Sequence, residues 1–397
     1  MAHSSKDQAT IVIVGAGSIG LWTAYFLAQA QAGPQHASKI TVIDACHSPF
    51  AATSRTCTGC IHYAFEADGL VELGRYSFEL WDALSHDDAF RSAVSWRSSS
   101  IFGVERGDGE NLDLLPEWLR RREGWRVNRE FLGARNAMVN PIGVGKWLAD
   151  RCTELGVRIY TSTVLTSVAQ DEDGRVHQLI CTRDDRMIKV PCEKLVLAGG
   201  PWTPAVYEKL FPSSAVHLEL VMDAGDWMVF RNPNPSTEKS IAFIGLNNIV
   251  HEKLEFAGRD DGTIWVCGRR DTPGALVPLG TAGEVNVRMV AELTGRSYRF
   301  LQVQRNDDPE SFEELQVESL GRSFRPCTRS GLPMMSAVSL SQLCERSSRR
   351  PGSGKVMSQL IRGKDPDIDI SPFIIPGKSG GETCSADVAK TIHRSSL

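Results

Sequence analysis

The stretch that decides the fold is IVIVGAGSIG, residues 11–20. Its β-branched run, residues 11–14, predicts a buried parallel strand, and the apolar residues 21–30 that follow the glycines predict a helix. In a G-x-G-x-x-G turn the first glycine permits the tight turn, the second lets a pyrophosphate approach the backbone, and the third lets helix and strand pack closely. The helix N-terminus adds free amides and a positive dipole end. The pattern predicts a dinucleotide site at Gly15, Ala16, Gly17, Ser18, Ile19 and Gly20.

A second apolar strand, KITVIDA at residues 39–45, completes a β-α-β unit with this turn. Asp44 lies at the end of that strand, beside Ala45. An acidic residue at this place suits a hydrogen-bond acceptor for a ribose hydroxyl. We therefore expect Asp44 and Ala45 to line the cofactor site. The alternative is a structural turn with an aspartate at the surface.

The composition is that of a soluble globular protein with room for two domains. Its 397 residues are 42% hydrophobic and 23% charged, with a net charge of −4 and a pI near 6.2. No basic cluster indicates a nucleic-acid partner. Ten sparse cysteines favour reduced thiols in an intracellular protein. The uncharged stretch 11–35 contains the glycine turn, so we expect no membrane span.

Periodicity outlines the rest of the chain. Helices are predicted over 70–84, 143–155 and 284–293, a small meander over 164–190, and a buried strand from 194 into a double glycine. Alternating strands between 216 and 270 have the composition of an antiparallel sheet, and a further strand is expected over 315–324. Residues 336–350 are rich in serine and arginine and show neither strand nor helix periodicity.

Two further segments favour FAD over NAD as the dinucleotide. The small, hydroxyl-rich stretch AATSRTCTGC, residues 51–60, could let a flat ring lie against backbone, and Ala198-Gly199-Gly200 adds another strand-to-glycine turn. An NAD(P)-dependent dehydrogenase would not need the loop at 51–60. The single pair Cys57 and Cys60 lacks the four ligands of a structural zinc site, so we expect no metal.

With these motifs the chain resembles the D-amino-acid oxidase (DAO) superfamily of FAD-dependent oxidoreductases, which includes glycine oxidase, sarcosine oxidase and amadoriase-type enzymes. It looks nearest to the uncharacterised fungal members. The resemblance is carried in order by VIVGAGSIG, IDA, TSRTCTG, NPIGVGKWLADRCTELGV, LVLAGGPWTP and GRSFRPCTRSGLPMM. It implies an α/β fold: a Rossmann-like (GR2-type) FAD-binding domain, and an α+β substrate domain whose antiparallel sheet roofs the flavin. The FAD domain would comprise residues 1–82, 136–215 and 318–397, and the substrate domain 83–135 and 216–317.

The same resemblance implies roles for individual residues. Arg325, in FRPCTRSGLP, would grip a substrate carboxylate, for which a guanidinium offers a bidentate fork; the alternative is an arginine that pairs with an internal acid or is exposed. His62 would lie at the edge of the active site, unless it is a structural histidine. We expect FAD to be bound non-covalently, because Ser323 occupies the position at which some relatives carry a cysteine that bonds covalently to FAD. The other residues expected at the cofactor are Ser54, Arg55, Thr56, Gly59, Val164, Gly199, Gly200 and Trp202.

Tryptophans in the 216–270 strands could form an aromatic cage for a cationic amine. The periodicity instead favours Trp227 and Trp265 as core residues.

The stretch RRPGSGKV, residues 349–356, superficially resembles a Walker A loop. Arg349 replaces its first glycine and Val356 its hydroxyl residue, so a phosphate loop is not expected. By resemblance it is the start of a helix that faces the flavin, with Gly352, Gly354 and Lys355 at the cofactor. The family's last strand and its flavin-covering Gly-His loop are expected to be missing just before it.

The chemistry implied is oxidation of a C–N bond in a small amine or amino acid, by hydride transfer to flavin N5 with O₂ as the final oxidant. A role in fungal secondary metabolism rests on analogy alone. The competing hypothesis is a flavin-less or catalytically impaired member, acting as an interaction protein or arising from a splice or gene-model defect. We expect a cytoplasmic location; the C-terminal Ser395-Ser396-Leu397 is only a weak peroxisomal signal, since it lacks the basic middle residue.

Overall fold

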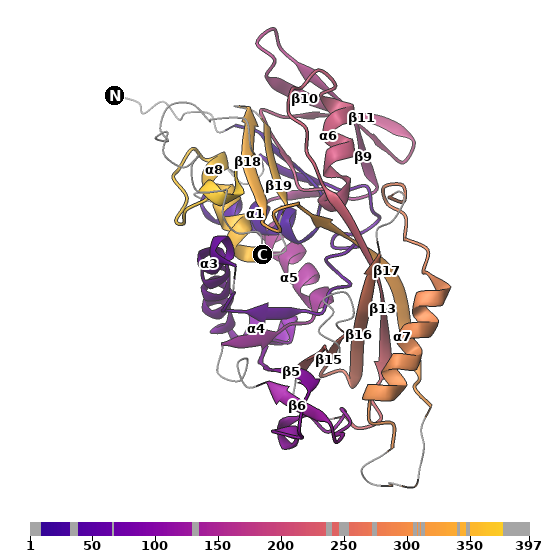
Figure 1. The fold of residues 1–397 in the computed structure, drawn as a ribbon. Coiled ribbons are helices and arrows are strands. Elements are labelled where there is room, and N and C mark those ends of the chain that lie inside the picture. The colour runs from indigo at the N-terminus through magenta and orange to yellow at the C-terminus, as the bar shows by residue number, and fades with distance from the viewer. Residues whose placement is uncertain are drawn as a thin grey trace.

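A computed structural model gives the fold of the chain (Figure 1). It describes residues 9–31, 39–65, 67–128, 135–235, 240–245, 254–271, 276–304, 308, 310, 314–339, 342–346 and 350–375. The C-terminal tripeptide lies outside these residues. Within the described part of the chain, no helix has both the length and the apolar character that crossing a bilayer requires.

The expected α/β sheet is present and has six strands. Its order is β18-β19-β12-β1-β2-β8, and all neighbours pair in parallel except β18 and β19. The bounds are β1 Ile11–Val14, β2 Ile40–Ile43, β8 Arg158–Tyr160, β12 Lys194–Leu197, β18 Met334–Ser339 and β19 Gln342–Arg346. β1 and β2 are almost completely buried, as parallel strands covered on both faces are.

The expectation that the last strand of this sheet is missing was wrong. Strand β19 pairs in parallel with the buried strand β12, with Leu195 opposite Gln342 and Leu197 opposite Cys344. β18 and β19 form an antiparallel hairpin on the sheet edge. The serine- and arginine-rich sequence shows no strand periodicity. Its backbone can still satisfy the donors and acceptors that β12 presents, and strand formation depends on such context more than on propensity.

Five helices pack beside this sheet, in the indigo, magenta and yellow segments of Figure 1. They are α1 Ser18–Gln29, α3 Asp68–Ser85, α4 Asp88–Val94, α5 Pro141–Glu154 and α8 Arg350–Ile361. The predicted helices at 21–30, 70–84 and 143–155 are confirmed. α5 begins at Pro141, two residues before the predicted start, because the Asn140 side chain caps it by accepting hydrogen bonds from the amides of Ile142 and Gly143. α1 is buried along nearly its whole length, which its few polar residues allow.

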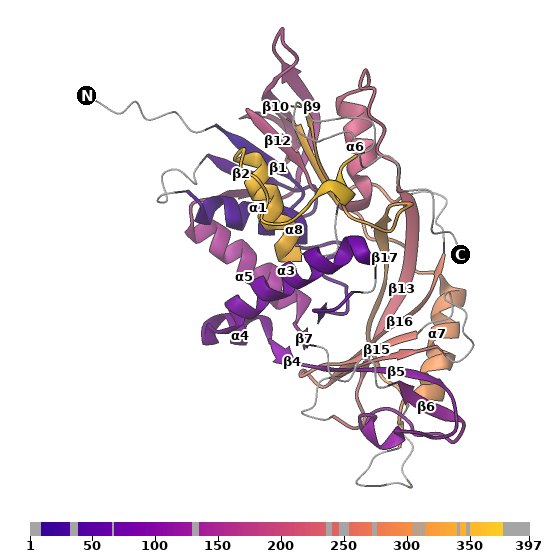
Figure 2. The same ribbon diagram turned by 60° about the vertical axis from the view of Figure 1, so that its left-hand side comes forward.

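The second large layer is a seven-stranded sheet of order β17-β13-β16-β15-β14-β5-β6. It is antiparallel except for the pair β14 and β5. Its strands are β5 Ser100–Arg106, β6 Trp125–Asn128, β13 Val221–Arg231, β14 Ser240–Ile244, β15 Leu254–Gly258, β16 Thr263–Asp271 and β17 Val317–Cys327. In Figures 1 and 2 this sheet lies between helix α7, Val287–Phe300, and the helices of the first layer. The alternating strands and the helix expected near residue 284 are confirmed.

A buried ion pair anchors α7 to its sheet. Arg322 Nη1 on β17 donates to Asp226 Oδ2 on β13 at 2.8 Å, and these side chains are 9% and 2% exposed. The other oxygen, Asp226 Oδ1, accepts from the amide of Asn286 at 3.1 Å, and Asn286 in turn caps the helix. We call the face of the sheet that contacts α7 its outer face.

Smaller elements complete the fold. The predicted meander is confirmed as the antiparallel sheet β11-β10-β9, and a second small sheet has the order β3-β7-β4. The strands are β9 Thr163–Gln170, β10 Val176–Arg183, β11 Arg186–Pro191, β3 Cys60–His62, β7 Asn136–Met138 and β4 Arg97–Ser98. Short helices are α6 Thr203–Leu210, η1 Leu112–Leu114, η2 Gly200–Trp202 and η4 Ser371–Phe373.

Two helical glycines provide a matched test of this packing. A Cβ on Gly354 of α8 would lie 2.5 Å from Trp22 Cβ of α1, whereas a Cβ on Gly295 of α7 would meet no atom within 4 Å. Gly354→Ala should therefore lower the free energy of unfolding by about 1–3 kcal/mol through overpacking. Gly295→Ala should raise it by up to about 1 kcal/mol, because alanine favours helix. Urea unfolding of both variants measures the difference, and equal effects would contradict the close α1–α8 packing.

Candidate functional site

Two glycine turns meet at one edge of the six-stranded sheet. β1 and β12 run in parallel and in register, so their carboxyl ends coincide at Val14 and Leu197. The Ala198 amide donates to Val14 O at 2.8 Å. Gly15 has φ +110°, and a Cβ there would overlap Ala198 O. The structure thus explains why glycine is needed at Gly15 and places the Gly199 turn directly beside it. Ligands of open α/β sheets bind at such carboxyl edges.

The N-terminus of α1 opens beside this edge. Its N-cap residue is Gly17, which has no side chain to cap the helix, and the first turn has no acidic residue. A Cβ on Gly17 would meet only Ser54 Oγ, at 3.3 Å, while one on Gly20 would overlap Gly15 O. The Ser18 amide donates to Ser54 Oγ at 3.0 Å, and the buried Ser18 hydroxyl has no hydrogen-bond partner. A helix start with a glycine N-cap and no acidic residue in its first turn is suited to an anion.

Asp44 supports the turn from the side. Its carboxylate accepts from the amide of Ala16 at 2.5 Å and from that of Cys46 at 2.8 Å. Burial raises the pKa of Asp44 above its usual value, although these two amides favour the charged form. The carbonyl of Asp44 accepts from the amide of Thr163, which precedes the predicted cofactor residue Val164. The structure therefore brings Asp44 and β9 together, and the carboxylate also has a structural task that the motif did not reveal.

The hydroxyl-rich loop, residues 51–59, connects this edge to the seven-stranded sheet. Thr53 Oγ1 donates to Phe324 O on β17 at 2.7 Å. The hydroxyls of Thr56 and Ser323, also on β17, are 2.6 Å apart. Arg259 Nη2 donates to the carbonyl of Cys57 at 3.4 Å. The loop therefore lies against strand β17.

Two predicted cofactor residues of this loop have different surroundings. The Arg55 side chain is exposed. Gly59 has φ +85°, and a Cβ there would overlap Val139 O, so the glycine permits close packing against the backbone.

The sheet face that the loop contacts carries one cross-strand row. We call it the inner face, because it lies opposite α7. Trp227 on β13 pairs with Cys267 on β16, Cys267 with Glu255 on β15, and Glu255 with Phe243 on β14. The neighbours of these residues along the strands, such as Met228 and Val266, pack with Leu293 of α7 instead. Because side chains alternate along a strand, the row points the other way.

Glycines border this row. Gly321 on β17 lies opposite Trp227, and Gly103 on β5 lies opposite Phe243. A Cβ on Gly321 would approach the Trp227 ring to 2.6 Å, so the glycine allows the indole to lie over β17. Trp265 is buried in the core as expected, at 4% exposure, whereas Trp227 is only partly buried.

Arg325 lies on β17 at the margin of this row. Its terminal nitrogens make long contacts, with Nη1 3.9 Å from Asp223 Oδ2 and Nη2 3.8 Å from Cys267 Sγ. The side chain is 31% exposed. Burial disfavours the charged form, but Cys267, Asp223 and Glu255 outweigh it, and the pKa of Arg325 is raised. The guanidinium is therefore charged, and neither nitrogen is held in a close ion pair by these groups.

His62 reaches the same region from β3. Its ring stacks on Phe243 at a centroid distance of 6.4 Å, and its Nε2 lies 2.9 Å from Cys60 Sγ. Burial raises the pKa of the Cys60 thiol well above its usual range, with Glu255 and Cys57 adding to the effect. The structure places the His62 ring against Phe243 on the inner face of the large sheet. Its role there stays a prediction.

The remaining predicted residues fall into two groups. Trp202 lies near β17: its Nε1 donates to Val277 O at 2.8 Å and its ring meets Phe324 edge-on. A Cβ on Gly200 would have no neighbour within 4 Å.

The residues of α8 make packing contacts instead. Gly352 contacts Ser77 of α3, Gly354 contacts Trp22, and Lys355 Nζ lies 5.0 Å from the Phe26 ring of α1. The predicted helix is confirmed, and these contacts account for its glycines and lysine without a ligand.

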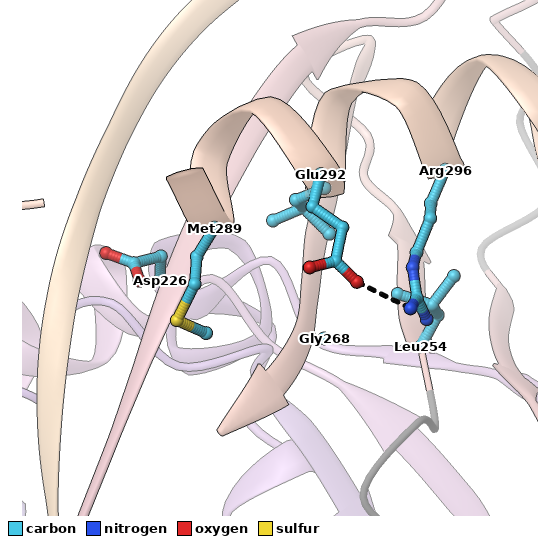
Figure 3. A pocket seen from close by; sticks show the side chains of 7 residues that line it. Asp226, Leu254, Gly268, Met289, Glu292 and Arg296 are labelled. Atoms are coloured by element: carbon cyan, nitrogen blue, oxygen red, sulfur yellow. Dashed lines mark hydrogen bonds and ion pairs between the residues drawn. The ribbon is translucent and has the colours of Figure 1, made fainter. Parts of the chain in front are cut away.

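A small pocket on the outer face does not belong to this site. It lies between α7 and the strands of the sheet, and Figure 3 shows Glu292 and Arg296 of α7 side by side over it. Their ion pair spans 2.5 Å, and Asp226 at the other end is held by Arg322. The volume of this pocket is enough for about one water molecule. The pocket therefore suits no organic ligand.

Comparison with known proteins identifies the family. The profile of the family "FAD dependent oxidoreductase" (DAO) matches residues 10–347, most of the chain. The chain belongs to this family. The DAO superfamily and the α/β fold with a second, antiparallel α+β part, both predicted from the sequence, are thereby confirmed.

Solved structures share the fold at low identity. An L-amino acid deaminase from Proteus myxofaciens, in complex with anthranilate, has 17% identity and a TM-score of 0.67, with 94% of each chain covered. Glycine oxidase from Geobacillus kaustophilus has 16% identity and a TM-score of 0.67, covering 94% of this chain and 99% of its own. NikD, an amino acid oxidase essential for nikkomycin biosynthesis, has 17% identity and a TM-score of 0.68, covering 92% and 97%.

The residues present fit an FAD molecule. Family membership implies a flavin cofactor. The start of α1 with its glycine N-cap, the open space over Gly17 and the partnerless Ser18 hydroxyl provide an anion cradle. The loop 51–59 and the inner face of the large sheet lie next to it. Of the residues that line this region, Glu255, Cys267, Phe243 and Arg259 were not predicted. Strand patterning alone does not tell which face of β15 or β16 meets the loop.

Gly17→Ala tests the cradle. Gly17 has an extended backbone, with φ −76° and ψ −171°, which alanine also adopts, and its Cβ would meet only the Ser54 hydroxyl. The variant should therefore unfold in urea within about 1 kcal/mol of the parent when flavin-free. Its affinity for FAD should fall by at least about tenfold, or about 1.4 kcal/mol, because the methyl group occupies the space of the pyrophosphate. Fluorescence titration with FAD measures this, with Gly295→Ala as the control. An unchanged affinity would refute the cradle.

Proposed function

We propose that the protein uses FAD to oxidise a C–N bond of a small amino acid or of an amine that carries a carboxylate. The observation that carries this proposal is the position of Arg325. It lies on the inner face of the large sheet, beside the loop that connects this face to the glycine turns, and its contacts with Asp223 and Cys267 are 3.8–3.9 Å long. A guanidinium in such a place can accept a carboxylate in a bidentate pair.

The chain's own residues would divide the work between binding and positioning. Ser54 orients the start of α1, and the amides of that helix would hold the pyrophosphate. Arg325 would orient the substrate by its carboxylate, and the row from Trp227 to Phe243 would exclude water above it. When bound, the flavin supplies the oxidising chemistry by accepting a hydride. Positioning of this kind requires no nucleophile from the protein.

Non-covalent binding of FAD is part of the proposal. Ser323 occupies the position at which some relatives carry an attaching cysteine, and its hydroxyl lies 2.6 Å from that of Thr56. A serine cannot form the thioether. Cys327 lies further along β17, and its thiol donates to Asp223 at 3.8 Å.

One reason for the competing hypothesis, a flavin-less family member, was a strand missing from the parallel sheet. Strand β19 fills that position beside β12. The sequence still has no glycine between 334 and 351, so no Gly-His loop follows the strand. FAD retention is therefore the property to measure.

The visible spectrum of the purified protein tests the proposal first. We expect flavin absorption bands at about 370 and 450 nm, and yellow colour released into the supernatant by acid, because the cofactor is held without a covalent bond. A screen of amino acids and amines with peroxide detection then follows. A folded protein that stays colourless after incubation with FAD would exclude the proposed function. Colour retained in the acid precipitate would exclude non-covalent binding.

Arg325→Lys tests the carboxylate site. Lysine keeps the charge but loses the fork, so KM for an amino acid substrate should rise by about 10- to 100-fold, about 1.4–2.7 kcal/mol, with a smaller change in kcat. Amines without a carboxylate should be affected far less. The control is Arg231→Lys on β13, which changes an exposed arginine paired with Glu318. Equal losses for substrates with and without a carboxylate would contradict the assigned role.

A further inference from the structure

The segment that leads into helix α7, residues 276–283, reaches from the large sheet to the parallel sheet. We call this segment the strap. Near its start, Trp202 Nε1 donates to Val277 O at 2.8 Å. At its end, Gly283 pairs with Arg322 of β17 in an isolated antiparallel bridge. The strap is therefore attached at one end to the turn that follows β12 and at the other to the large sheet.

The tip of the strap is a tight turn that rests on the chain just after Asp44. The amide and the hydroxyl of Thr281 both donate to Pro278 O, at 3.1 and 2.7 Å, and close the turn. Gly280 has φ +82°, a conformation that L side chains disfavour. A Cβ on Gly280 would lie 3.0 Å from Ala45 O. The glycine thus permits both the turn and its close contact with the parallel layer.

These attachment points place the strap across the cofactor edge. Three strands of the parallel sheet follow the order β12, β1, β2, and neighbouring strands are about 4.8 Å apart. Trp202 lies five residues after β12 and Ala45 two residues after β2, so the glycine turn that follows β1 lies between them in this order. An extended chain advances about 3.4 Å per residue, so the steps from 277 to 280 can cover about 10 Å, the width of two strand spacings.

The adenosine half of a dinucleotide is expected at the place that the strap crosses. In this fold an acidic residue at the end of the second strand accepts a ribose hydroxyl, and Asp44 has that position. The strap itself carries no charged residue, so it does not repel a pyrophosphate. Residues 278–282 are exposed. Because little buried area holds the tip, it can separate from the sheet without unfolding of the layers.

We propose that the strap is a gate over the adenosine half of the FAD site, and that it opens to admit and release the cofactor. The inference rests on the proposed function, because it takes FAD as the ligand. If FAD enters and leaves only while the strap is open, a change that disfavours the closed strap raises the association and dissociation rates by the same factor. The affinity for FAD then changes little.

Gly280→Ala tests the gate by stopped-flow measurement of FAD fluorescence. A methyl group at this φ and this close to Ala45 O disfavours the closed tip, so both rates should rise by about tenfold. The matched control is Gly262→Ala in the turn before β16. Gly262 has φ +76°, but a Cβ there would meet no atom within 4 Å, so the same backbone strain should leave both rates unchanged.

Trp202→Phe tests the other attachment. It removes the hydrogen bond to Val277 O and keeps an aromatic ring beside Phe324, so both rates should rise, by about threefold or more. A lost contact with FAD would instead raise the dissociation rate alone and weaken the affinity. Such a result in both variants, or unchanged rates in both, would overturn the gate.

ADP separates this inference from the proposed function. It carries the half of the cofactor that the strap crosses but no flavin, and stopped-flow tryptophan fluorescence can follow its exchange. Faster ADP exchange in Gly280→Ala, in a protein that is colourless and inactive, would uphold the gate and refute the oxidoreductase. An active yellow protein in which Gly280→Ala exchanges FAD and ADP at the parent rates would refute the gate alone.

Discussion

The site depends on the hydrogen bonds of one short loop, residues 51–59. At its start, Ser54 accepts from the first amide of helix α1, which fixes the loop to the dinucleotide turn. Thr53 and Thr56 then bond to β17, and Thr58 bonds to Glu255 on β15. Each bond is modest alone, but together they set the distance between the glycine turns and the inner face of the large sheet. Without them, neither Arg325 nor Glu255 would have a defined position relative to the cofactor edge.

The two layers tolerate sequence change differently. The centre of the parallel sheet admits little variation, since Gly15 and Gly20 lie where a single methyl group would overlap backbone. The edge admits more: β18 and β19 are built from a serine- and arginine-rich segment with no glycine loop after it. An edge hairpin needs mainly a neighbouring strand with which to pair. The family fold can therefore persist while its C-terminal connection departs from the usual pattern.

The family resemblance predicted helix α8 correctly, but the structure explains its glycines and lysine by helix packing rather than by contact with the cofactor. Gly352 and Gly354 permit close contact with α3 and α1, and Lys355 covers the Phe26 ring. A helix that packs this tightly could still direct its N-terminus to a flavin. These residues therefore have a packing role in the core, whether or not they also contact the cofactor. Glu255 is the opposite case, because no motif pointed to it and only its cross-strand pairing places it on the face that meets the loop.

The sequence by itself determined the dinucleotide turn, the β-α-β unit, the family and the candidate Arg325. These depend on local rules, such as glycine at a positive φ and strand followed by helix, or on a motif that survives at low identity. The tertiary structure alone decided that 342–346 joins the parallel sheet and that Asp44 supports the turn. It also decided that Glu255 shares a face with Arg325. These features arise from pairing between segments far apart in the chain, and a strand's own sequence does not state its register or which face meets the cofactor.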